Sequence, residues 1–119
     1  MNLSLSAIED VLVDLKNEIE EMIYTFELPN EAALQVTGSS VSGWILNLTR
    51  YGLDADQLVR AEALVQRLPV EQIISDQLSI LVTLESDPSS GAELIYQILT
   101  EAVGLAPGDA IPLEVISAF

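Results

Sequence analysis

The sequence predicts an all-α protein: a compact single-domain bundle of five to six helices with a long N-terminal amphipathic helix. Apolar residues between Leu5 and Phe26 recur every three or four positions, which places them on one side of an α-helix. Similar stripes follow along the chain, separated by residues that start and stop helices. The connections between the stripes are short, as is typical of neighbouring antiparallel helices.

The first expected helix runs from residue 6 to about residue 27. Ser6 and Glu9 have the spacing of a capping box, and Pro29 disfavours a longer helix. Positions that flank the stripe hold Val11 and Ile23, which offer no charge pairs to a parallel twin. The stripe therefore favours a bundle helix over a coiled-coil seam, with homodimerisation through this or another helix left open. Its members are Leu5, Ile8, Leu12, Leu15, Ile19, Met22 and Phe26.

Residues 30–51 give a more mixed pattern. Residues 30–36 fit a short helix, although the run over residues 32–36 could also be extended, and residues 37–40 are typical of a turn. A helix is expected over 41–51, with Trp44, Ile45 and Leu48 on its buried face and Gly52 at its end. Trp44 is the only tryptophan, and we expect it in the core.

Three more helices are expected at 54–68, 69–85 and 87–104. Asp54 and Gln57 have the spacing of a reciprocal cap, Asp87 followed by Pro88 is a strong start signal, and Gly104 suits a helix end. Residues 112–119 form either one last short helix or a tail. In the second case the tail packs three apolar side chains, namely Leu113, Ile116 and Phe119.

Length and composition limit the function. A chain of 119 residues fits one domain, residues 1–119, and a hydrophobic content of 50% argues against disorder despite a net charge of −15. The 4 cationic residues are too few for a surface that tracks nucleic acid or an anionic membrane. The partner is therefore expected to be a protein, and a basic protein fits the charge. Without a leader or an apolar span, a cytoplasmic location is expected.

No motif supports catalysis, a cofactor or a metal site. The stretch from Gly38 to Gly43 has the glycine spacing of a P-loop, but Trp44 stands where the lysine belongs. Asp54 and Asp56 resemble the start of a calcium loop, and the pattern then breaks. The chain has no cysteine or histidine, so a serine nucleophile lacks its usual base. The protein is not expected to be an enzyme.

The function that these observations favour is a non-enzymatic protein–protein interaction module, such as an adaptor, a regulator or an assembly factor. The alternative is an acidic inhibitor that mimics nucleic acid and occupies the basic groove of a nuclease or DNA-binding protein. A carboxylate-based hydrolase ranks last. Residues expected at a partner surface are exposed apolar side chains and the arginines: Val13, Tyr24, Leu46, Arg50, Arg60 and Arg67.

Overall fold

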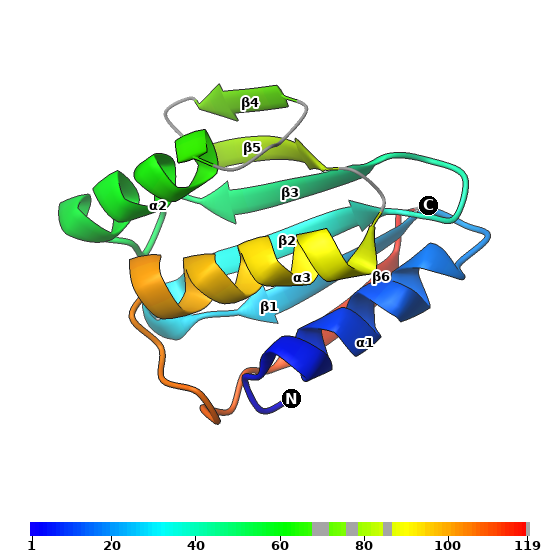
Figure 1. The fold of residues 1–119 in the computed structure, drawn as a ribbon, viewed down its shortest axis with the longest axis horizontal. Coiled ribbons are helices and arrows are strands. Elements are labelled where there is room, and N and C mark those ends of the chain that lie inside the picture. The colour runs from blue at the N-terminus through cyan, green and yellow to red at the C-terminus, as the bar shows by residue number, and fades with distance from the viewer. Residues whose placement is uncertain (68–71, 76–78, 85–86, 119) are drawn as a thin grey trace.

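A six-stranded antiparallel sheet forms the centre of the molecule (Figure 1). The computed structural model describes residues 1–67, 72–75, 79–84 and 87–118. The strand order is β4-β5-β3-β2-β1-β6, so the fold is a mixed α/β fold and the prediction of an all-α bundle of five to six helices is wrong. The strands are β1 (Met22–Glu27), β2 (Ala33–Gly38), β3 (Trp44–Thr49), β4 (Gln72–Ser75), β5 (Ser79–Leu84) and β6 (Leu113–Ser117).

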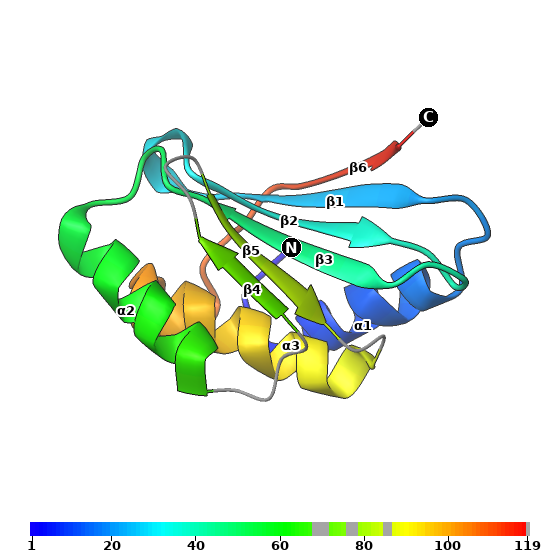
Figure 2. The same cartoon turned by 90° about the horizontal axis from the view of Figure 1, so that it is seen from above.

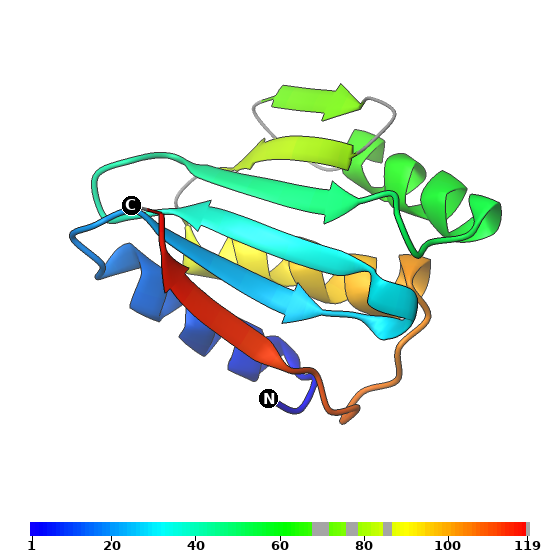
Figure 3. The ribbon, with the colours of Figure 1, turned by 180° about the vertical axis from the view of Figure 1, so that it is seen from behind.

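The helices lie together on one face of this sheet, as Figure 2 shows. They are α1 (Leu5–Lys16), α2 (Ala55–Arg67) and α3 (Pro88–Gln97), which continues into the π-helical turn η2 (Ile98–Ala102). A 3-10 turn, η1 (Pro29–Glu31), joins β1 to β2. In the described part of the chain no helix covers the opposite face (Figure 3). None of the described helices is long and apolar enough to cross a membrane.

The hydrophobic core lies between the helices and the sheet. Every second residue of β2, β3 and β5 is buried, which is the alternation of a sheet with one covered face. Trp44 is fully buried, so its predicted place in the core is confirmed. The largest fully buried partners are Phe26, Leu3, Ile8, Leu12, Leu15, Leu34, Leu46, Leu48, Ile80, Ile95 and Ile98.

The first helix is shorter than predicted. It begins after Ser4, whose hydroxyl accepts a hydrogen bond from the Ala7 backbone N–H at 3.1 Å, and it ends at Lys16. Ile19 follows the helix and is 84% exposed. Met22 and Phe26 belong to β1 instead. Residues four apart share one face in a strand as well as in a helix, so this spacing could not separate the two structures.

The β2–β3 hairpin replaces the helix that was expected over residues 41–51. The extended alternative for residues 32–36 is confirmed from residue 33 onward, because Ala33–Gly38 forms β2 between β1 and β3. Residues 37–40 do lead into a turn. Gly38 lies against the indole of Trp44, and a Cβ atom there would collide with Trp44 Cδ1. The hairpin therefore needs a glycine where the tryptophan folds back over the strand.

The start of α2 is as predicted. The Asp54 backbone N–H donates to Gln57 Oε1 at 2.9 Å, and the Gln57 N–H donates to Asp54 Oδ1 at 2.8 Å. This reciprocal pair satisfies two backbone donors that a helix leaves free at its first turn. Ala61, Leu64 and Val65 then face the core.

Two strands, β4 and β5, occupy most of the region that was predicted as a helix over residues 69–85, so that prediction is wrong. Its expected start at Pro69 lies outside the described residues. The next start signal is confirmed: Asp87 caps α3, accepting a hydrogen bond from the Ser89 N–H at 3.2 Å, and Pro88 is its first residue. Gly104 follows η2 with φ of +92°, as expected for a glycine after a helix.

The C-terminal segment forms neither of the two structures that were expected. Leu113–Ser117 is the edge strand β6, paired with β1, while Phe119 lies outside the described residues. The N-terminus is held beside the loop that leads into this strand. The Met1 ammonium donates to the Ile111 carbonyl at 2.8 Å, and the Ile111 N–H donates to the Met1 carbonyl at 2.7 Å.

Candidate functional site

One face of the sheet has no helix over it in the described part of the chain, and we call it the open sheet face. Because side chains alternate along a strand, the positions between the buried ones point to this face. Figure 3 shows the sheet from this side. From strand pairing and burial, its members are Glu114 and Ile116 on β6, Ile23, Thr25 and Glu27 on β1, Ala33, Gln35 and Thr37 on β2, Ile45, Asn47 and Thr49 on β3, and Ser79, Leu81 and Thr83 on β5.

The open sheet face carries almost no charge. On β2, β3 and β5 its positions hold only apolar side chains, hydroxyls and amides. Its two carboxylates, Glu27 and Glu114, lie on β1 and on the edge strand β6. In a chain with a net charge of −15, this distribution leaves one broad surface from which water can be removed without burying many ions.

One row of side chains crosses five strands of this face. Paired positions place Ile116, Ile23, Thr37, Ile45 and Thr83 next to one another in that order. Ile45 is 45% exposed and Ile116 is 46% exposed. We call these five residues the isoleucine row. Ile116 and Ile23 are direct neighbours, and Ile45 lies between the two threonines. Several large apolar side chains exposed on one surface are typical of contact surfaces.

The neighbouring row is polar and partly paired. Gln35 Nε2 donates to the Thr25 hydroxyl at 3.2 Å. Next to Gln35 across the strands lies Asn47, whose side-chain oxygen is buried and has no hydrogen-bond partner among the described residues. An unmade hydrogen bond at a buried acceptor costs about 1–3 kcal/mol, so a donor brought by a partner would stabilise a complex here once the amide rotates toward it.

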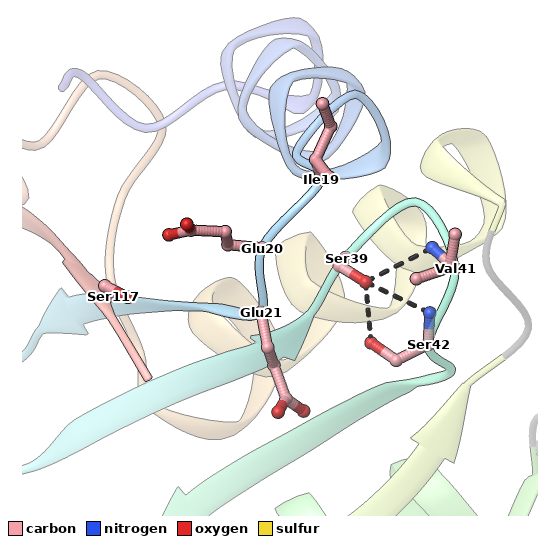
Figure 4. Close-up of a pocket in the computed structure, with 7 residues that line it drawn as sticks. All are labelled: Ile19, Glu20, Glu21, Ser39, Val41, Ser42 and Ser117. Carbon is pink, nitrogen blue, oxygen red and sulfur yellow. Dashed lines mark hydrogen bonds between the residues drawn. The ribbon is translucent and has the colours of Figure 1, made fainter. Parts of the chain in front are cut away.

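A groove of about 590 Å³ lies at one end of the sheet. Figure 4 shows its lining: Ile19, Glu20, Glu21, Ser39, Val41, Ser42 and Ser117. Ser39 Oγ accepts hydrogen bonds from the backbone N–H groups of Val41 at 3.2 Å and Ser42 at 3.0 Å, and it lies 2.9 Å from Ser42 Oγ. The Trp44 indole N–H donates to the Ser39 carbonyl at 3.2 Å. These bonds hold the β2–β3 turn in shape, so the serines serve this turn.

The apolar residues that were expected at a partner surface lie in different places. Val13 is exposed on α1, whereas Tyr24 and Leu46 are buried in the core. The expected exposure of Leu46 came from helical phase. Leu46 lies on β3, where alternation points it to the covered face and points Ile45 to the open one. Residues 44–46 are all apolar, so no alternation in the sequence marked Ile45 as the outward-facing residue.

The arginines that were expected at the surface divide into two groups. Arg50 pairs with the Glu62 carboxylate. Arg60 donates to the main-chain carbonyls of Glu101 at 3.1 Å and Ala102 at 3.0 Å, so it caps η2. Arg60 and Arg67 line one pocket together with Ala63, Leu64 and Glu101.

The pKa of Tyr24 gives a prediction for alkaline pH. Burial raises the pKa of this phenol above its usual value, and the negative charges of Glu18 and Asp14 raise it further. The folded state therefore holds the proton more tightly than the unfolded state does. Ionisation of Tyr24 leaves stability unchanged below the pKa of tyrosine in the unfolded chain, about 10. Stability then falls as the pH rises from that value through the pKa of Tyr24 in the folded state. Urea midpoints at about pH 8 and pH 11 measure this fall.

The matched variant for that measurement is Tyr24→Phe, which keeps the ring and removes the ionising group. Tyr51 and Tyr96 remain, so the comparison isolates Tyr24. We expect the variant to lose less stability than the wild type between the two pH values. Equal losses in both proteins would show that Tyr24 does not ionise at a cost to the fold.

The described side chains offer no metal centre: they contain no group of three or more His, Cys, Asp or Glu that could hold an ion. Asp54, the first residue of the calcium-like pattern, caps α2 instead. The site that the structure presents is thus a surface with apolar and polar rows. No protein-family model, curated protein or solved structure matches this chain.

Proposed function

We propose that this chain is a non-enzymatic protein-interaction module and that the open sheet face is its contact surface. The observation that carries the proposal is the near absence of charge on that face in a chain with a net charge of −15. Transfer of a charged side chain out of water costs far more than transfer of isoleucine or threonine. A surface of this kind therefore suits a partner that covers it, and a cytoplasmic location is part of the proposal.

The energetic contribution of this surface comes mainly from the isoleucine row. Removing apolar area from water contributes about 25 cal/mol per Å². The row crosses five strands, so one flat partner surface contacts several of its side chains at once. Threonine hydroxyls and the Asn47 amide add polar groups whose hydrogen bonds give orientation.

A basic partner would use a different surface. Acidic side chains cover the outer sides of the helices, for example Asp10 and Asp14 on α1 and Glu93 on α3, all of them exposed. The alternative function, mimicry of nucleic acid, therefore depends on the helical side. Its binding weakens steeply with salt, whereas apolar contacts at the open sheet face do not.

The experiment compares two variants as baits for proteins from the native source. Ile45→Glu puts a charge into the isoleucine row, and Val59→Glu makes the same change at a residue of α2 that is 66% exposed. We expect capture by the wild type and by Val59→Glu, little capture by Ile45→Glu, and the same pattern in about 0.5 M salt, where the Debye length is only a few Å. Capture that survives Ile45→Glu and disappears in salt would contradict the proposal and support the acidic mimic.

A further inference from the structure

We propose that the protein covering the open sheet face is a second copy of this chain, so that two sheets pack face to face in a reversible homodimer. The inference rests on the proposed function, because it names the occupant of the same surface. Its starting point is electrostatic. Two copies with a net charge of −15 each repel one another, so they can associate only where few acids are brought together.

The open sheet face meets that condition better than the helical side does. Among the described residues, the strands bring two acids to it, Glu27 and Glu114, both on the β1–β6 side of the sheet. A third, Glu21, lies at its end, directly before β1. When two such faces meet, the helices and their acids point outward in opposite directions. The two acidic layers are then separated by both sheets, and neighbouring layers lie about 10 Å apart. The distance between the two acidic layers therefore exceeds the Debye length, which is about 8 Å at physiological salt.

The size of the face suits a weak and reversible dimer. The five strands that carry the face, spaced about 4.8 Å apart, span about 19 Å, and a six-residue strand is about 20 Å long. Face-to-face contact therefore covers roughly 800 Å² in total, which is below the size of a stable interface and in the range of weak, transient contacts. The dimer is expected to dissociate on dilution.

The position of the isoleucine row agrees with a two-fold symmetric contact. The middle of the strand order falls between β3 and β2, where Ile45 lies opposite Thr37. In a symmetric dimer the same patch meets itself, so the Ile45 side chains of both copies come close to the axis. A charge introduced at Ile45 is thus brought into the interface twice.

Sedimentation equilibrium over a concentration series tests this arrangement. We expect the wild type to dimerise reversibly, Val59→Glu to behave like the wild type, and Ile45→Glu to raise the dissociation constant at least tenfold. Thr37→Glu, in the same row on β2, is a second variant in case Ile45→Glu does not fold, which circular dichroism checks. Higher salt should tighten the dimer, because it screens the repulsion between like charges.

Three results would overturn the inference: a wild type that stays monomeric at every concentration, a dimer that neither row variant weakens, or a dimer that Val59→Glu weakens as much as they do. The failure of this inference is separable from that of the proposed function. A monomeric wild type that still captures another protein through Ile45 would overturn the homodimer and leave the interaction surface in place.

Discussion

Replacing Leu46 with alanine is expected to lower the free energy of unfolding by about 2–5 kcal/mol, the usual range for truncating a buried leucine. Leu46 is fully buried on β3, between Val36 of β2 and Val82 of β5. Neither neighbour can move far without breaking its own strand pairing, so the site collapses poorly and a cavity remains. Chemical denaturation with a constant slope measures the loss.

The matched control is Ile45→Ala, one residue earlier on the same strand. Ile45 points to the open sheet face, so its truncation should cost less than about 1 kcal/mol in the monomer, as for most surface changes. The helix expected over residues 41–51 would give a larger loss of unfolding free energy at Ile45 than at Leu46, because such a helix buries Ile45 and exposes Leu46. A larger loss at Ile45 than at Leu46 would therefore contradict the strand and its phase.

The second large effect is expected at Gly52, in the turn between β3 and α2. Gly52 has φ of +82°, and a Cβ atom there would collide with the Asn30 carbonyl oxygen and would lie 2.7 Å from the Ala32 backbone nitrogen. Both obstacles are backbone atoms, so neither can swing aside. Gly52→Ala should lower the unfolding free energy by about 2–5 kcal/mol, from a left-handed conformation and from steric overlap together.

Gly104 provides the control for this substitution. Its φ is +92°, and nothing lies within 4 Å of the position that its Cβ would occupy. Gly104→Ala should therefore cost only the conformational part, about 1–2 kcal/mol. Thermal or urea denaturation of both variants separates the two contributions. Equal losses would show that the turn at Gly52 is not packed against η1 as the structure has it.

Structural features that depend on local signals in the sequence were predicted well. The cap formed by Asp54 and Gln57, the start at Asp87–Pro88 and the glycine at 104 depend only on residues within one helical turn. Interactions at that range do not require the rest of the fold. The start of the first helix was also placed within two residues, although Ser4 rather than Ser6 caps it.

The strands were missed because their stabilising partners lie far away in the sequence. Met22 and Phe26 continue the spacing of α1, yet they lie on β1, which pairs with β2 on one side and with residues 113–117 on the other. Leucine, alanine and glutamine favour helices by themselves, and tertiary pairing overrides that preference. The composition of residues 33–36 therefore left their structure ambiguous. Residues 79–84, which include the β-branched Ile80, Val82 and Thr83, were assigned to a helix from the spacing of their apolar residues.

The candidate site was even less accessible to sequence reasoning. Ile23, Ile45 and Ile116 become one row only through the register of β6, β1, β2 and β3. No spacing along the chain reveals that register. Net charge and the small number of basic residues give an expectation about partners. The surface on which charge is missing could be located only from the arrangement of the sheet.

The most direct test of the open sheet face as the contact between two copies is an isoleucine-methyl NMR series over increasing protein concentration. If two copies pack through this face, the methyl signals of Ile23, Ile45 and Ile116 shift together. Ile8, a buried residue of α1, and Ile19, exposed in the loop after α1, should stay unchanged. Signals of the row that do not move with concentration, or shifts confined to Ile19, would contradict this contact.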